Sequence, residues 1–427
     1  MNKHLVVTEA LESIPIREGD PKALSPSEAD ELHRYIRLQE LDERNIIVGR
    51  SDVRIVNYVG FIQLHTCSIE VLPKVRGNDA GRSRRVLLRM LEETGFLDIA
   101  SSQWSDLHLE RANLYEILGY LFATKLKHEL YKGPYLAYQP VEENLMQVRG
   151  KILFSRQIFN EATKSSRLVC GYDRFDMNTP LNQVFKAALL VLMPRVVHAE
   201  TQKLLRLCLI VLDEVDAVPA RALTSWKVQL DRTNRRFAAS YSLACLILKG
   251  SAMTTSRGFE RHVSIVFKMN ELFEAFIAAL ARRVFRTVSV QDKSYKLLIK
   301  ENTDRGALQL IPDIVVTRPD GSQVIIDTKW KLLQEQAMRQ GVQREDLYQM
   351  YAYLTRYKRA DTTILLYPDF GQTHETGPHQ VWRLEDQPGK KLKVFTIDYE
   401  HEQRAGEALS RMVWGEASNA DITLLWE

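Results

Sequence analysis

The sequence predicts an α+β protein of several domains, with a β-rich module at the N-terminus, a helical middle and a C-terminal α/β core built on a mixed sheet. With 427 residues, the chain exceeds the usual size of one compact core. Short Val- and Ile-rich runs fill the start, apolar residues recur at a period near 3.6 in the middle, and strand-like and helical patterns alternate in the last third. Apolar residues make up 45% and charged residues 26%, a balance that excludes disordered and membrane-embedded proteins.

The expected domains follow the changes in these patterns. Residues 1–80 form the β-rich module, because NIIVGR, VRIVNYVGFIQL and SIEVLPKV are strand-like runs separated by glycine and polar turns. Residues 81–250 are expected to be mainly helical, with a return to loop and strand between YKGPY and GKILF. The small, polar stretch 250–258 predicts a linker, so the last domain is expected to span 259–427.

The net charge and the cysteine content exclude few classes of protein. The net charge of +4 and an isoelectric point near 8.7 fit a protein that meets phosphate, but an excess this small is common in other proteins too. The basic segments 82–85 and 232–237 either contact DNA phosphates or are solvated helix ends. The four cysteines are scattered without a CxxC pair, which predicts reduced thiols and no zinc site. No apolar stretch reaches eighteen residues and the N-terminus lacks a secretory signal, so we expect a cytoplasmic protein that does not use a membrane.

The candidate catalytic residues lie in the last third of the chain. Residues 308–333 (LQLIPDIVVTRPDGSQVIIDTKWKLL) predict a β-hairpin, because a Pro-Asp-Gly-Ser turn separates two β-branched runs. Side chains two positions apart on a strand point to the same face, so Asp327 and Lys329 are expected to project together from the second arm. The turn folds Asp313 of the first arm back to the same place. Two carboxylates and one amine are therefore expected to converge.

This group suits hydrolysis of a phosphodiester, which needs a divalent ion to polarise the phosphoryl oxygen and to lower the pKa of an attacking water. Hard oxygen ligands favour Mg2+, with Mn2+ as a substitute. Asp313 and Asp327 would hold the ion, with the backbone carbonyl of Thr328 as a third ligand. Lys329 would position the water or offset charge on the phosphate. The sequence therefore predicts a Mg2+-dependent nuclease site.

Each of these signals also has a simpler interpretation. An Asp-x-Lys on a strand edge is usually a solvated ion pair, but here both arms are expected to be buried, and unpaired buried charges are costly unless they bind something. The helix predicted over 342–357 places Asp346, Gln349 and Tyr353 on one face, which either faces the site or is a polar helix margin. Nearby aromatic residues such as Trp330 are more often packing residues than a base-reading platform.

The motifs IPD at 311–313 and DTK at 327–329, together with the helix that carries Gln349 and Tyr353, resemble the PD-(D/E)xK nuclease superfamily. Over nearly the whole chain the sequence also resembles the McrC family, on the segments VGFIQLHTCSIEVLPKV, ENLMQVRGKILF, YDRFDMNTPLNQVFKAAL and MNELFEAF. The resemblance implies a PD-(D/E)xK nuclease fold for residues 259–427 and catalytic roles for Asp313, Asp327 and Lys329. It implies supporting roles for Glu274, Gln349 and Tyr353, although a helix glutamate is usually only a solvated surface charge.

McrC proteins are nuclease subunits of McrBC-type, modification-dependent restriction systems, which act in antiviral defence. The resemblance therefore implies a partner, a McrB-like AAA+ GTPase hexamer that recognises modified cytosine such as 5-methylcytosine in double-stranded DNA and is stimulated by McrC. It also implies that the N-terminal module, residues 1–80, engages this partner. The chain contains no GxxxxGK[ST] motif, so we expect no GTP site in it.

Three hypotheses remain open at this point. The chain is an endonuclease subunit that cuts DNA only with a GTP-driven partner, a free-standing nuclease of repair or recombination, or a non-catalytic adaptor that activates an AAA+ protein. An intact set of Asp313, Asp327 and Lys329 argues against the adaptor, which has no use for the full trio.

Overall fold

The computed structural model describes residues 3–96, 112–162, 166–223, 227–252, 264–303, 305–333, 341–371 and 377–415. The chain divides into two compact units. The first unit consists mainly of residues 1–98 and 266–427, and the second mainly of residues 112–265. Most of the predicted linker at 250–258 lies outside the described residues.

The C-terminal part of the first unit is built on a six-stranded mixed sheet with the strand order β11-β14-β15-β16-β18-β17. The central strands β15, β16 and β18 run parallel to one another, while β11, β14 and β17 pair antiparallel with their neighbours. Its strands are β11 (Val288–Val290), β14 (Ile314–Thr317), β15 (Gln323–Thr328), β16 (Ala360–Pro368), β17 (Gln380–Arg383) and β18 (Lys391–Ile397). A separate antiparallel ribbon joins β12 (Lys296–Ile299) to β13 (Gly306–Gln309). The expected mixed sheet is therefore present.

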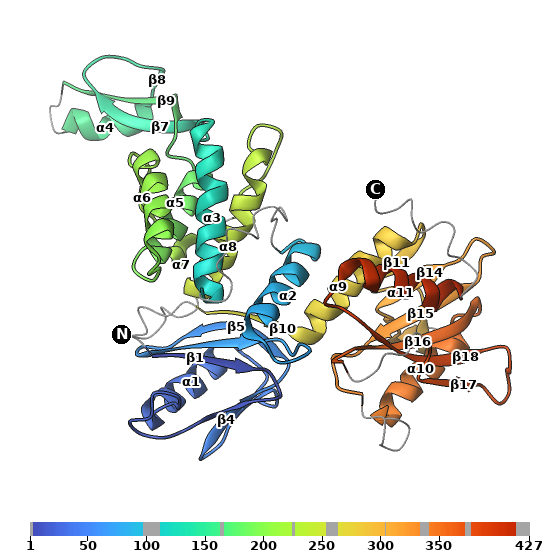
Figure 1. Ribbon diagram of the computed structural model, residues 1–427. Coiled ribbons are helices and arrows are strands. Elements are labelled where there is room, and N and C mark those ends of the chain that lie inside the picture. The colour runs from blue at the N-terminus through green and yellow to red at the C-terminus, as the bar shows by residue number, and fades with distance from the viewer. Residues whose placement is uncertain are drawn as a thin grey trace. The chain divides into compact units, whose positions relative to one another are not determined.

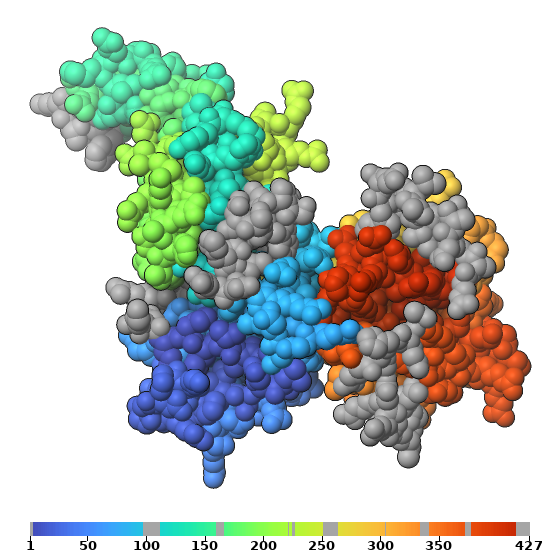
Figure 2. Space-filling model, viewed as in Figure 1, coloured from blue at the N-terminus to red at the C-terminus, as the bar shows by residue number. Residues whose placement is uncertain are grey.

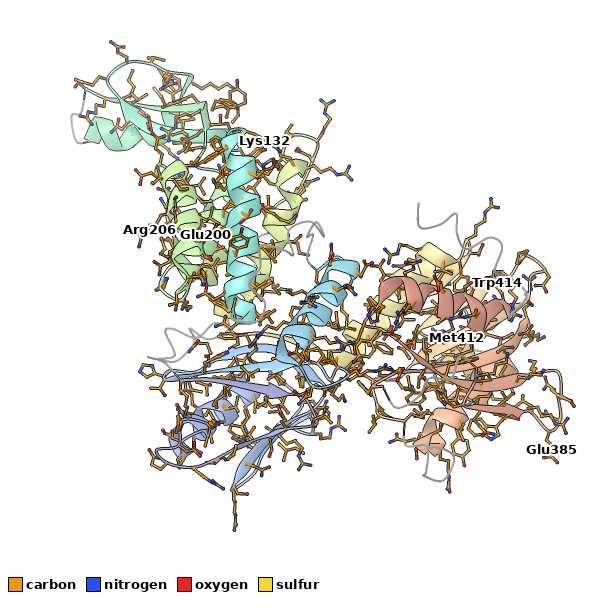
Figure 3. All side chains as sticks on the ribbon, viewed as in Figure 1. Lys132, Glu200, Arg206, Glu385, Met412 and Trp414 are labelled. Carbon is orange, nitrogen blue, oxygen red and sulfur yellow. The ribbon has the colours of Figure 1, made fainter. Side chains whose placement is uncertain are left out.

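Helices cover both faces of this sheet. Helix α10 (Arg344–Arg356) lies on one face, and α9 (Met269–Val284) and α11 (Glu402–Trp414) lie on the other (Figure 1). Helix α11 forms part of the surface that Figure 2 shows in dark red. Its Met412 and Trp414 are labelled in Figure 3, and the Trp414 ring lies 6.1 Å from that of Phe285, just after α9. The alternation along the buried strands sends one set of side chains to each helical layer.

The N-terminal part of the first unit is a small module with two sheets and one core. Strand β1 (Lys3–Thr8) pairs in parallel with β6 (Cys67–Leu72), which is antiparallel to β5 (Tyr58–Gln63), and the sheet order is β1-β6-β5-β10. The other elements are β2 (Ser13–Pro15), α1 (Pro26–Leu38), β3 (Ile46–Val48), β4 (Asp52–Ile55), α2 (Ala80–Glu93) and β10 (Ile265–Lys268). Strands β2, β4 and β3 form the second sheet. Apolar residues of both sheets and of α1 share one buried core.

Helix α1 is the element that the strand-like pattern of residues 1–75 does not predict. It begins with a capping box, in which the Ser25 hydroxyl accepts a hydrogen bond from the Glu28 amide and Glu28 accepts one from the Ser25 amide. Pro26 occupies the first turn, where its missing N–H costs nothing. The local signal Ser-Pro-Ser-Glu was therefore present in the sequence, in a region dominated by strand-like runs.

Loss of this cap is expected to weaken the module. Ser25→Ala should lower the free energy of unfolding by about 1 kcal/mol, because the Glu28 amide in the first turn loses the hydroxyl that accepts its hydrogen bond. Ser51→Ala, at an exposed position elsewhere in the module, should change it by less than about 0.5 kcal/mol. Urea denaturation of both variants compares the two values, and equal values would contradict a capping role for Ser25.

The expected boundary at residue 80 differs from the structural division. Helix α2 packs on β6 and on α9, and its buried Arg84 pairs with the fully buried Glu70 of β6 at 2.7 Å. A buried ion pair of this kind ties a helix to its sheet, because either partner alone would be left as an uncompensated buried charge. Helix α2 therefore belongs to the first unit and not to the helical middle.

The second unit is a helical bundle with a small sheet. Helix α3 packs on α6 and α8, and α5 packs on α6, α7 and α8 (Figure 1). Glu200 and Arg206, labelled in Figure 3, lie on α6. The helices are α3 (Leu114–Tyr131), α4 (Phe154–Ala162), α5 (Pro180–Leu192), α6 (Ala199–Val211), α7 (Ala220–Leu223), the short 3-10 helix η2 (Arg235–Phe237) and α8 (Ala238–Ala252). The sheet has the order β7 (Ala137–Leu145), β9 (Leu168–Asp176) and β8 (Lys151–Ile152), all antiparallel. Residues 81–250 thus carry more strand than their helical pattern predicts.

The four cysteines are free thiols, and Cys67, Cys170 and Cys208 are buried. Burial raises the pKa of Cys67 and of Cys208 to about 12, which keeps both protonated at neutral pH. Among the residues that the structure describes, no helix has both the length and the hydropathy needed to cross a membrane.

Candidate active site

The hairpin of β14 and β15 places two aspartates at one end of the mixed sheet. The strands pair antiparallel with Ile314 opposite Ile326, so Asp313 and Asp327 each lie one residue from this pair, at the same end of the hairpin. The turn between the strands is closed by a hydrogen bond from the Arg318 amide to the Ser322 carbonyl and contains Gly321 at a φ of +83°. Because β15 is flanked by strands on both sides, Asp327 lies at the end of a buried strand.

Asp313 is held by the opposite arm of the hairpin. The Thr328 amide donates to Asp313 Oδ2 at 2.7 Å, and the Thr328 hydroxyl donates to the same oxygen at 2.8 Å. These contacts fix the carboxylate of the first arm against the end of the second arm. The expected convergence of Asp313 with Asp327 therefore has a direct structural cause, and the role of the Thr328 hydroxyl is one that spacing alone did not indicate.

Asp327 and Lys329 form a close ion pair. The Lys329 amine lies 2.5 Å from Asp327 Oδ2, and no directed hydrogen bond reaches this oxygen from the described residues. Asp327 is only 1% exposed. A buried carboxylate is costly without a nearby cation, and Lys329 supplies one here; a metal ion at Asp327 would be a second.

The electrostatics of the two aspartates are coupled. Burial raises the pKa of Asp327, and the neighbouring charge of Asp313 raises it further against the opposing effect of Lys329. Burial also raises the pKa of Asp313, and the charge of Glu274 adds to this effect, while the Thr328 hydrogen bonds oppose it. Burial alone would lower the pKa of the Lys329 amine, but the charge and hydrogen bonding of Asp327, together with the charges of Asp346 and Asp313, outweigh it and the pKa is raised. Two buried aspartates with raised pKa values beside a protonated lysine are typical of a functional site, because a bound cation would favour the ionised aspartates.

Helix α10 turns its polar face toward this group. The Lys329 amine donates to Gln349 Oε1 at 3.1 Å, Gln349 Nε2 donates to the Tyr353 hydroxyl at 2.9 Å, and that hydroxyl donates to the Ile311 carbonyl at 3.0 Å. Asp346 Oδ1 lies 3.6 Å from the Lys329 amine. The predicted stripe on this helix therefore faces the site and links Lys329 to the backbone two residues before Asp313.

Glu274 lies on α9, on the other side of the hairpin, and is half-buried. Its carboxylate accepts a hydrogen bond from the side-chain amide of Gln291. Burial raises the pKa of Glu274, and the charge of Asp327 raises it further. Its charge in turn affects Asp313. The structure thus brings Glu274 within electrostatic range of both aspartates.

The donor set fits Mg2+. Mg2+ is commonly bound through one or two carboxylates while it keeps several waters and gains phosphate ligands from a substrate. Asp313 and Asp327 supply two carboxylates, with an oxygen of Asp327 that lacks a directed donor. Over the described part of the chain, no three side chains of His, Cys, Asp or Glu are grouped as a metal site.

The Gln349 side chain is expected to affect the activity of the site by holding the Lys329 amine in position. Gln349→Ala removes one contact of the Lys329 amine and one of the Tyr353 hydroxyl, so we expect any DNA cleavage that depends on Lys329 to fall by about 10- to 100-fold with the fold retained. Gln343→Ala provides the control, because Gln343 contacts Lys331 instead. Initial cleavage rates at saturating Mg2+ compare the two variants, and equal rates would contradict a supporting role for Gln349.

The fold and this cluster define a mixed α+β protein whose six-stranded sheet carries two aspartates and a lysine at the ends of paired strands. The chain belongs to the family of McrBC 5-methylcytosine restriction system components, whose sequence model matches residues 53–368.

Solved structures agree with this fold. A chain of the refined half-complex from the tetradecameric assembly of Thermococcus gammatolerans McrB AAA+ hexamers with bound McrC matches with a TM-score of 0.74 and 20% identity, over 96% of this chain and 100% of that one. A chain of the cryo-EM structure of the Thermococcus gammatolerans McrBC complex matches with a TM-score of 0.52 and 22% identity, over 69% of this chain and 90% of that one. No curated protein sequence matches the chain.

Proposed function

We propose that the chain is the McrC-like endonuclease subunit of a GTP-dependent restriction complex that cleaves DNA carrying modified cytosine. The observation that carries the proposal is the convergence of Asp313, Asp327 and Lys329 at one end of the hairpin, where no directed hydrogen bond from the described residues reaches the buried Asp327 Oδ2. The family of the chain supplies the biological setting, since its members are components of 5-methylcytosine restriction systems.

The chain's own residues divide the work of hydrolysis. Asp313, Asp327 and the Thr328 carbonyl would hold Mg2+ or Mn2+, which when bound polarises the phosphoryl oxygen and lowers the pKa of a coordinated water. The Lys329 amine, kept protonated beside Asp327, donates to the water or to a non-bridging phosphate oxygen and offsets the charge that builds there. Gln349 and Tyr353 keep the amine in place, and Glu274 supports the pair of aspartates from α9.

The proposed partner is a McrB-like AAA+ GTPase hexamer. The solved assemblies that this chain resembles contain McrB AAA+ hexamers with bound McrC. The chain has no GxxxxGK[ST] motif of its own, so the energy of GTP hydrolysis and the reading of modified cytosine are assigned to the partner. We further propose that the N-terminal module takes part in binding this partner.

Plasmid cleavage tests the proposal. Methylated and unmethylated plasmids are incubated with Mg2+ and this chain, with and without the AAA+ partner and GTP, beside an Asp327→Ala chain. The proposal predicts cutting of methylated plasmid only when partner, GTP and Asp327 are all present. Cutting by the chain alone would indicate a free-standing nuclease. Stimulated GTP hydrolysis without any cutting would indicate an adaptor.

A further inference from the structure

A buried carboxylate of the N-terminal module reaches the residue beside Lys329. Glu9 directly follows β1, and its side chain is fully buried. Its Oε1 accepts a hydrogen bond from the indole N–H of Trp330 at 2.7 Å and lies 3.0 Å from the Lys74 amine, while its Oε2 accepts one from the Asn57 amide at 3.0 Å. Two of these partners belong to the module and one to the nuclease core. Glu9 is therefore a junction between the two parts of the first unit.

Trp330 is enclosed on its other sides by aromatic rings. Its ring lies 5.2 Å from Phe273, 5.4 Å from Phe370 and 5.3 Å from Tyr399, centroid to centroid. The Lys74 amine lies 5.5 Å from the centre of the Trp330 ring, within the range of a cation–π contact. The ring therefore has no solvent-facing alternative for its N–H group, and Glu9 is the acceptor that it uses.

The backbone around Lys329 is held by contacts just beyond the end of the strand. Strand β15 ends at Thr328. The Lys329 amide donates a hydrogen bond to the Leu366 carbonyl at 2.9 Å, and the Lys331 amide donates one to the Lys329 carbonyl at 3.0 Å. Trp330 is thus the first buried side chain after the strand ladder, one residue beyond Lys329.

The buried Glu9 carboxylate is not explained by stability alone, because burying a charge costs free energy of desolvation. Apolar residues of similar volume often stabilise a core as well as a buried ion pair does, whereas removal of one partner leaves an uncompensated charge. A carboxylate supplies something that an apolar side chain lacks, a directional acceptor that selects one orientation of the indole. The geometry of Glu9, Lys74 and Trp330 is therefore better explained by positioning than by stability.

We propose that Glu9 is a positioning residue of the nuclease site. Through its hydrogen bond to Trp330, the N-terminal module sets the position of the Lys329 amine relative to the two aspartates. A shift of β1 within the module is transmitted by the same contact to the site. This inference rests on the proposed function, because it takes Lys329 to act in cleavage.

The test compares Trp330→Phe with the wild-type chain under conditions in which cutting depends on Asp327. The phenylalanine keeps an aromatic ring in the cluster and leaves the Glu9–Lys74 pair intact, but it removes the N–H group. We expect kcat for cleavage to fall by about 10- to 100-fold, because small displacements of a catalytic group have effects of this size. The KM for DNA should not change. Glu9→Gln leaves one acceptor oxygen for the donors Trp330 and Asn57 on opposite sides of the group, so it should act in the same direction. The double variant should be no slower than the slower single variant.

Tyr399→Phe is the matched control. The Tyr399 hydroxyl donates to the Lys74 carbonyl in the same cluster, and its loss leaves the Glu9–Trp330 contact in place. The positioning role predicts that Tyr399→Phe cuts at close to the wild-type rate even if its melting temperature falls as much as that of Trp330→Phe. Rates that follow the melting temperature in all variants, or a wild-type rate for Trp330→Phe, would overturn the inference.

Hydrogen exchange separates this inference from the proposed function. Trp330→Phe should speed exchange of the Lys329 amide while the amides of β1 keep their wild-type protection, and Tyr399→Phe should leave the Lys329 amide unchanged. Unchanged exchange at Lys329 in Trp330→Phe, or uniform acceleration across the unit, would contradict positioning by Glu9. If no cutting depends on Asp327, the proposed function fails, and the exchange data still decide whether Glu9 fixes this segment.

Discussion

Replacing Asp327 with asparagine is expected to reduce DNA cleavage by on the order of a thousandfold or more, and at the same time to stabilise the metal-free chain above pH 7. The loss of cleavage follows because a neutral amide is a poor ligand for Mg2+ at the point where Asp313, Asp327 and Lys329 meet. The gain in stability follows because burial and the charge of Asp313 raise the pKa of Asp327 to about 7.

The direction of the pH effect follows from proton linkage. In the unfolded chain an aspartate ionises near a pKa of about 3.9, whereas in the folded chain Asp327 keeps its proton to higher pH. Between these values the folded state binds more protons, so the free energy of unfolding falls as pH rises, and the loss is complete above the folded pKa. The raised pKa already includes the attraction of Lys329, so asparagine at this position removes a net cost. The melting temperature of the variant at pH 8 should therefore exceed that of the wild-type chain by a few degrees.

Asp320→Asn is the control for this prediction. Asp320 lies in the turn of the same hairpin, is exposed, and has a pKa lowered by its hydrogen bonds to Ser322. Its replacement should leave cleavage unchanged and should not raise the melting temperature. Thermal unfolding from pH 5 to pH 8 without metal, together with cleavage rates, compares the two variants. An Asp327→Asn chain that cuts normally, or that is less stable than the wild type at pH 8, would contradict the account.

Replacing Lys329 with methionine is expected to separate metal binding from catalysis. Methionine has a similar length and no charge, so it removes the amine that lies 2.5 Å from Asp327 Oδ2. Cleavage should fall by about a hundred- to a thousandfold, because the group that offsets charge on the phosphate is lost. Mg2+ should bind more tightly, because the amine no longer competes with the metal for the Asp327 carboxylate.

Lys331→Met provides the matched control two residues further on. Lys331 is half-exposed and its amine lies 3.6 Å from Asp346, so it shares a partner with Lys329 but does not contact Asp327. The rise in melting temperature on addition of Mg2+ reports metal binding in each variant. The account predicts a larger rise for Lys329→Met than for Lys331→Met. Weaker Mg2+ binding in Lys329→Met, or an equal loss of cleavage in both, would show that Lys329 does not have the proposed role.

The parts of the site that the sequence predicted are those that short-range spacing determines. The turn at 319–322 fixes the hairpin, the two-residue period of a strand brings Asp327 and Lys329 together, and helical periodicity brings Gln349 and Tyr353 to one face. Each of these relations is set within one or two neighbouring elements. The structure places all of these residues in one cluster.

The features that the sequence did not predict depend on distant pairs or on competing local signals. The contact between Glu9 and Trp330 joins residues 321 positions apart, and no periodicity carries such information. Helix α2 continues the helical pattern of the middle region, but its buried Arg84 pairs with Glu70 and places it in the first unit. Helix α1 was obscured because its capping box at Ser25 lies among short strand-like runs.

The most direct test of the central claim is the position of a metal in crystals of this chain soaked with Mn2+, located by anomalous diffraction. The account predicts an anomalous peak between the carboxylates of Asp313 and Asp327, next to the Thr328 carbonyl, that is absent from Asp327→Asn crystals. A saturating Mn2+ soak that gives no peak at this place, or a peak that persists in Asp327→Asn, would contradict the assignment of these residues as the metal site of a nuclease.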